Sequence, residues 1–135
     1  MKLERALPEL LLSLRRKLNE RMKGERFGDE LTFSQLEVLS FVESGPRTME
    51  RIAAHLRVKP PSVTAIVDRL EDAGLVARGK DETDRRITKV TATAKAARRL
   101  SERRERKEAA FRELLAKLST RDRKELERIL RILTS

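Results

Sequence analysis

The feature that most constrains the fold is a stretch, residues 48–91, in which two short amphipathic helical patterns precede two β-rich runs. Thr48 stands where it can cap the first helix. The apolar residues of that helix recur at helical spacing: Ile52, Ala53 and Leu56. Residues 57–59 then predict a tight polar turn before the second helix.

Two prolines, Pro60 and Pro61, stand where the second helix begins. A proline costs little there because the first N–H groups of a helix have no intrahelical partner. The predicted buried face of this helix consists of Val63, Ile66, Val67 and Leu70. Gly74, directly after Ala73, is at a usual place for a helix to stop.

Residues 75–78 and 87–91 predict two strands. The loop between them, residues 79–86, carries three acids and three bases. Two helices joined by a tight turn and followed by a β-hairpin predict a helix-turn-helix with a wing. The expected fold class is therefore mainly α, with a small β-hairpin wing and additional helices at both ends.

The same residues resemble the MarR family of bacterial winged-helix repressors. The resemblance is carried by Ser62-Val63-Thr64, Val67-Asp68-Arg69-Leu70-Glu71, Gly74-Leu75-Val76-x-Arg78 and Asp84-Arg85-Arg86. Residues 31–35 and 45–49 are similar to the segments with which that family enters its DNA-binding domain. The similarity is close over residues 31–93 and rests on pattern alone in the terminal helices.

The resemblance implies that the second helix docks in the major groove of double-stranded DNA. The small side chains of its N-terminal half permit close approach to base edges. The residues expected to contact DNA are Lys59, Pro61, Ser62, Thr64, Ala65, Arg69, Arg78, Arg85 and Arg86. Asp84 is expected to brace Arg86, whose guanidinium enters the minor groove, and Arg78 and Arg85 are expected to contact phosphates.

Some of these residues also have structural interpretations. Ser62 and Thr64 can form hydrogen bonds at the start of their helix, Arg69 can pair within the protein, and Arg85 can be an exposed charge. The chain also departs from the family pattern. Lys59 replaces the serine or threonine that usually caps the second helix, and residues 92–96 replace the usual Leu-Thr-x-x-Gly.

Both ends of the chain carry apolar stripes at helical spacing. The first helix, ending near Met22, carries Leu3, Leu7, Leu10, Leu11, Leu14 and Leu18, and the last carries Leu126, Ile129, Leu130 and Leu133. Each stripe must be buried. The family's terminal helices interlock across a two-fold axis, which predicts a homodimer; helices packed within one chain are the alternative.

Three parts are expected along the chain. Residues 1–30 form a dimerisation helix and connector, residues 31–92 the winged helix-turn-helix, and residues 93–135 a linker helix with a second dimerisation helix. Thr32 and Gln35 match a capping box. The long helix predicted over residues 93–118 is almost wholly charged in its middle, which predicts solvent exposure there.

The net charge is +10, and much of the excess lies near the predicted winged domain. Residues 47–91 hold ten bases and seven acids, and residues 92–118 hold nine bases and four acids. This distribution favours a polyanionic partner. The alternative is a generally arginine-rich, highly charged surface.

The sequence offers little for other classes of function. It has no Cys and one His, His55, which fits a partly buried or surface residue better than a metal ligand. No catalytic constellation, phosphate-binding loop or cofactor motif is present, so an enzyme is not expected. No run of 18 apolar residues predicts a membrane span, and no secretory signal is recognised, so the default location is the cytoplasm.

The combined prediction is a homodimeric transcriptional regulator, of repressor type, that binds a pseudo-palindromic duplex. A small aromatic or anionic effector is a further expectation from the resemblance. Arg15, Arg16 or Arg21 on the first helix are its candidate partners. The alternative function is a winged-helix module that binds protein without specific DNA binding.

Overall fold

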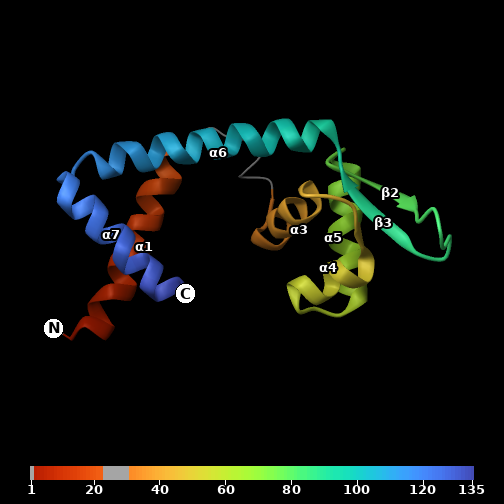
Figure 1. Ribbon diagram of the computed structural model, residues 1–135, viewed down its shortest axis with the longest axis horizontal. Coiled ribbons are helices and arrows are strands. Elements are labelled where there is room, and N and C mark those ends of the chain that lie inside the picture. The colour runs from red at the N-terminus through yellow and green to blue at the C-terminus, as the bar shows by residue number, and fades with distance from the viewer. Residues whose placement is uncertain (1, 23–30) are drawn as a thin grey trace. The chain divides into compact units, whose positions relative to one another are not determined.

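The computed structural model describes residues 2–22 and 31–135 (Figure 1). In chain order the elements are α1 (Leu3–Arg21), α3 (Phe33–Glu43), β1 (Arg47–Thr48), α4 (Met49–Leu56), α5 (Pro60–Asp72), β2 (Val76–Lys80), β3 (Thr88–Ala92), α6 (Ala94–Leu115) and α7 (Thr120–Thr134). The predicted fold class, mainly α with a small β wing, is confirmed. The predicted connector begins at Gly24, and its residues 24–30 lie outside the part of the chain that the structure describes.

The chain divides into two compact units. One contains residues 26–103 and the other contains residues 1–25 together with 104–135. The boundary falls within α6, and both chain ends belong to the same unit.

The helix-turn-helix follows the predicted local chemistry. The Thr48 hydroxyl accepts a hydrogen bond from the Arg51 backbone N–H at 3.2 Å and so caps α4. Arg57, in the turn, adopts the left-handed conformation (φ 58°, ψ 43°), which costs an L-residue roughly 1–2 kcal/mol. Helix α5 then begins at Pro60 after Lys59, which provides no side-chain cap, as predicted.

The end of α5 is fixed by the residues that open α6. Gly74 follows the helix with φ +74°, a conformation that glycine adopts without steric cost. The Lys95 ammonium donates to the carbonyl oxygen of Ala73 at 2.8 Å, and the Thr93 hydroxyl donates to that of Gly74 at 2.7 Å. The bond from Lys95 satisfies the carbonyl group of the C-cap residue, Ala73, for which the helix has no N–H partner. The bond from Thr93 fixes the residue that follows the cap.

One hydrophobic core holds the unit of residues 26–103 together. It joins one face of each of α3, α4 and α5 to the sheet and to the start of α6. Its fully buried large side chains are Leu39, Ile52, Leu70, Val38, Val42, Val63, Val67 and Val90. The predicted stripe of α5 is confirmed at Val63, Val67 and Leu70, whereas Ile66 is half-buried at its margin.

The sheet has one strand more than the sequence predicts. Its order is β1-β3-β2, and all pairings are antiparallel, with Arg78 opposite Val90. Strand β1 has only two residues, too few to show an alternating pattern, and it forms by pairing with β3. The two wing strands begin one residue later than predicted, because Leu75 and Ile87 lie outside the ladder. The tip of the β2–β3 hairpin projects away from α3, α4 and α5 (Figure 1).

In the other unit the apolar stripes lie largely on the surface. Helices α1 and α7 contain no buried residue. Leu3, Leu10 and Leu133 are 70%, 62% and 74% exposed. The predicted long helix ends at Leu115 rather than at residue 118, and its charged residues 104–108 are exposed, as predicted. A single chain therefore leaves these stripes without cover among the described residues.

Candidate nucleic-acid interface

Helix α5 presents the predicted contact residues on one exposed face. Because Val63, Val67 and Leu70 are buried, the helical period directs the positions between them outward. The α5 residues expected at DNA are all exposed: Pro61, Ser62, Thr64, Ala65 and Arg69. Lys59, at the N-cap of the same helix, is exposed too. The fold thus brings together side chains that the sequence singled out separately.

The two hydroxyl residues of this face differ in their hydrogen bonding. The Thr64 hydroxyl donates to the Pro60 carbonyl oxygen at 3.4 Å, the helix-start bond considered as an alternative. The Ser62 hydroxyl has no partner among the described residues. An oxygen that donates one hydrogen bond still has lone pairs to accept others. Both hydroxyls therefore keep hydrogen-bonding capacity on the exposed face.

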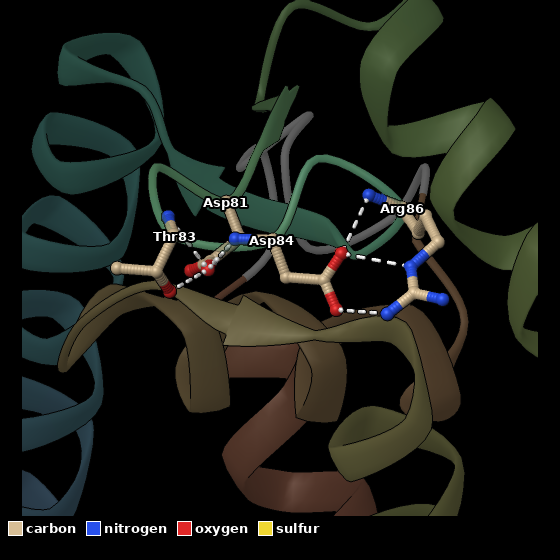
Figure 2. Close-up of polar contacts among 4 residues, drawn as sticks. All are labelled: Asp81, Thr83, Asp84 and Arg86. Atoms are coloured by element: carbon tan, nitrogen blue, oxygen red, sulfur yellow. Dashed lines mark hydrogen bonds and ion pairs between the residues drawn. The ribbon is translucent and has the colours of Figure 1, made fainter.

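The wing contains the predicted pair of Asp84 and Arg86 (Figure 2). The Arg86 Nε donates to Asp84 Oδ1 at 3.1 Å, and Nη2 donates to Oδ2 at 3.2 Å. The Arg86 backbone N–H also donates to Asp84 Oδ1 at 3.1 Å. Arg86 lowers the pKa of the Asp84 carboxyl through these bonds. The Arg86 side chain is 90% exposed, so its guanidinium is both held by an acid and open to solvent.

A second acid, Asp81, organises the loop that carries this pair. Its Oδ2 accepts hydrogen bonds from the Thr83 backbone N–H at 3.1 Å, the Thr83 hydroxyl at 2.6 Å and the Asp84 backbone N–H at 2.9 Å (Figure 2). Its Oδ1 lies 2.8 Å from Lys89 Nζ. The Lys89 ammonium and the Thr83 hydroxyl hold the pKa of Asp81 well below its usual range. Asp81 and Lys89 were not among the site residues expected from the sequence. The available signal was the spacing of Asp81 from Thr83, which is typical of an Asx turn.

Arg78, expected at a phosphate, has acidic partners in the unbound protein. Its guanidinium forms ion pairs with Asp68, through Nη2, and with Glu71, through Nη1 at 2.8 Å. Both acids stand on α5, so Arg78 ties strand β2 to that helix. Asp68 is the main cause of the raised pKa of Arg78. The Arg78 charge is thus already matched by two carboxylates.

The remaining predicted cations are exposed. The side chains of Lys59, Arg69 and Arg85 form no ion pair or hydrogen bond with any residue the structure describes, so the internal pairing considered for Arg69 is not seen within this part of the chain.

His55 is exposed and stacks on the Phe41 ring, with centroids 4.0 Å apart. Within residues 2–22 and 31–135, no group of three or more His, Asp or Glu side chains is arranged to hold a metal ion. The described helices include none with the length and apolar character needed to cross a membrane.

The sequence of this domain matches proteins of one family. The MarR family model matches residues 29–87. Two curated relatives come from Bacillus subtilis. The uncharacterised HTH-type transcriptional regulator YcgE is 48% identical over 56 residues, which are 39% of this chain and 36% of that protein. The HTH-type transcriptional repressor MdtR is 34% identical over 84 residues, which are 62% of this chain and 54% of that protein. The matches therefore span about a third and about half of these relatives.

A solved structure extends the similarity beyond the wing. A MarR-like transcriptional regulator from Thermotoga maritima is 27% identical, with a TM-score of 0.80, over 100% of this chain and 99% of that one. Its similarity includes the terminal helices, for which the sequence offered only a pattern. The matching family model, the curated relatives and this shared winged-helix fold agree, and the domain of residues 29–87 is that of the MarR family of transcriptional regulators.

Proposed function

We propose that this protein is a homodimeric repressor that binds a pseudo-palindromic DNA duplex through α5 and the β2–β3 wing. The main support for the proposal is that two exposed surfaces suited to DNA occur in the same unit, residues 26–103. One is the exposed α5 face of small and hydroxyl side chains, and the other is the exposed, acid-braced Arg86. The name of MdtR, a transcriptional repressor, favours the repressor role. Selection of bound duplexes from a random DNA pool tests the proposal directly.

The α5 face is suited to a major groove. A helix fits that groove, and small side chains at Ser62, Thr64 and Ala65 let its backbone approach the base edges. The hydroxyl groups can pair with several bases, and the methyl group of Ala65 can meet that of a thymine. Specificity is therefore assigned to the N-terminal half of α5.

The wing is suited to a minor groove. A narrow A·T-rich minor groove concentrates negative potential, which attracts a guanidinium. Asp84 occupies Nε and one N–H of Nη2 and leaves Nη1 able to donate outward. The exposed Lys59, Arg69 and Arg85 are then the proposed contributors to phosphate binding.

Two substitutions should separate charge-based binding from base readout. Arg86→Ala should lower affinity for operator and random duplex alike, and should flatten the plot of log affinity against log salt by about one unit. Thr64→Val carries no charge change, so it should leave that slope unaltered and reduce discrimination by roughly 1–3 kcal/mol. Titrations of both variants at several salt concentrations measure these effects. Binding by Arg86→Ala that equals the parent at every salt would exclude the wing as a DNA contact.

Arg78 has a proposed role that differs from phosphate contact. Asp68 and Glu71 are negative charges on the helix that faces DNA, and Arg78 neutralises them. Without Arg78 both acids would repel the phosphate backbone over distances comparable to the Debye length. Arg78 would then support binding from within the protein.

Arg78→Met should weaken DNA binding by about three- to tenfold at low salt, and less at high salt. Adding Asp68→Asn and Glu71→Gln to Arg78→Met should restore most of the affinity, because no acid is then left unpaired. Equilibrium titration of the single and triple variants is the measurement. If the triple variant binds as weakly as Arg78→Met, Arg78 contacts a phosphate itself, as expected from the sequence.

The dimer is proposed to form through the terminal helices. Large exposed apolar stripes on α1 and α7 are typical of an interface. Leu126 and Leu130 on α7 are 37% and 47% exposed in the single chain. A second copy of the chain can cover these stripes with its own, because a two-fold interface brings together the same surface of both subunits.

Leu126→Glu combined with Leu130→Glu should convert the dimer to monomer or aggregate, because two carboxylates would enter an apolar interface. Deletion of residues 1–18 should do the same. Lys124→Glu, an exposed charge change on the same helix, is the matched control and should stay dimeric. Light scattering with circular dichroism measures mass and folding; a folded dimer of the double variant would exclude α7 from the interface.

We also infer an anionic aromatic effector. The first-helix candidates differ in the structure: Arg21 pairs with Glu113 at 3.1 Å, whereas Arg15 and Arg16 are exposed. A cleft of about 600 Å³ within the terminal unit combines apolar and basic side chains. Its lining includes Lys107, Phe111, Arg112, Leu115 and Arg123.

A phenolic carboxylate at millimolar concentration should therefore raise the thermal midpoint of the protein, since a ligand that binds only the folded state stabilises it. Arg15→Ala and Arg16→Ala should reduce the shift if α1 holds the carboxylate, and Arg112→Ala should do so if the cleft does. Differential scanning fluorimetry provides the measurement. Unchanged midpoints across a set of phenolic carboxylates would indicate regulation without such an effector.

A further inference from the structure

We propose that Asp81 and Lys89 are positioning residues for DNA recognition, which together fix the wing loop so that Arg86 is presented in one orientation. This inference rests on the proposed function, because it concerns how the wing's DNA contact is prepared. Neither residue is assigned a contact with DNA. Their role is to act through Asp84 on Arg86.

A continuous set of hydrogen bonds leads from β3 to the Arg86 guanidinium. Lys89 Nζ, on β3, holds Asp81 Oδ1 at 2.8 Å. Asp81 Oδ2 in turn accepts a hydrogen bond from the Asp84 backbone N–H at 2.9 Å, and the Asp84 carboxylate accepts hydrogen bonds from the Arg86 guanidinium (Figure 2). Each of these contacts is an ion pair or a hydrogen bond to a carboxylate. Hydrogen bonds to charged groups are stronger than those between neutral groups. The orientation of Asp84 therefore depends on Asp81.

The backbone of the loop closes around the same residue. The Asp81 N–H donates to the Ile87 carbonyl oxygen at 3.0 Å, and the Ile87 N–H donates to that of Asp84 at 3.0 Å. The Asp81 side chain is only 13% exposed, against 35% for Asp84 and 90% for Arg86. The least exposed acid thus lies at the base of the loop and the contact residue at its surface. Burial makes Asp81 suited to positioning rather than to direct contact.

Fixing Arg86 in advance has a consequence for affinity. A free, fully exposed arginine loses side-chain entropy when DNA immobilises it, and a side chain already held in place loses less. This benefit must exceed an electrostatic cost, because Asp81 adds a negative charge to a loop that faces a polyanion. Glu82 adds the same charge beside it, yet is exposed and forms no hydrogen bond or ion pair within the described chain.

This contrast gives a matched pair of variants that should change DNA affinity in opposite directions. Asp81→Asn and Glu82→Gln each remove one negative charge from the same loop. Glu82→Gln should tighten binding by up to about twofold, since one repulsive charge is gone. Asp81→Asn should instead weaken binding by about 3- to 10-fold, since the ion pair with Lys89 is lost and Arg86 is no longer fixed. A purely electrostatic role for Asp81 predicts tightening in both.

A double-mutant cycle tests whether Asp81 acts through Arg86. In an Arg86→Ala background, Asp81→Asn should lose its weakening effect and resemble Glu82→Gln. Thr83→Val, which removes one bond to Asp81 without changing charge, is the second variant and should weaken binding in the parent only. The probe is a synthetic A·T-rich duplex, titrated at several salt concentrations, with thermal unfolding and light scattering as controls on folding and mass.

The outcomes separate this inference from the proposed function. If Arg86→Ala weakens binding but Asp81→Asn and Thr83→Val do not, the positioning role is wrong and the wing contact stands. If Asp81→Asn weakens binding equally with and without Arg86, Asp81 acts by another route and the inference is overturned. If Arg86→Ala has no effect, the proposed wing contact itself fails.

Discussion

The proposed DNA interface of this protein depends on the burial of one side of α5. Val63, Val67 and Leu70 are fully buried in the core shared with α3, α4 and the sheet. Their burial fixes the rotation of the helix about its own axis, so Thr64, Ala65 and Arg69 face outward. At about 25 cal/mol per Å² of apolar surface removed from water, such side chains contribute on the order of 1.5–3 kcal/mol each. The same packing stabilises the domain and selects the face proposed to meet DNA.

The residues around α5 fix the position of both its ends. At the N-terminus, Arg57 turns the chain through the left-handed region and the two prolines follow directly. At the C-terminus, Gly74 follows the helix, and Lys95 and Thr93 donate to the carbonyl groups of Ala73 and Gly74, the two residues after α5. A helix held at both ends and along one face has little freedom to tilt, which suits a side chain that must meet a base edge at hydrogen-bond distance.

Charges in the winged domain are arranged so that acids hold bases in place. Asp84 holds Arg86, Asp81 holds Lys89, and Asp68 and Glu71 hold Arg78. Ion pairs near the protein surface contribute little to stability, so we assign these pairs a geometric role. The net positive charge of the region supplies general attraction for a polyanion, while these pairs decide where particular guanidinium groups lie.

Local sequence was sufficient for the helices, the caps, the wing and the exposed face of α5, because each rests on periodicity or on bonds between residues a few positions apart. Thr48 and Gly74 are of this kind, whereas the pair of Asp84 and Arg86 was expected from the family resemblance. Strand β1 and the partners of Arg78 and Lys89 were not predictable in this way. They arise from residues brought together across the sheet and from β2 to α5. Arg78 and its acids stand on different elements, so their spacing along the chain does not predict a contact. Only packing of the core brings these groups within reach, so only the tertiary structure could assign Arg78 to α5 and Asp81 to the support of the wing.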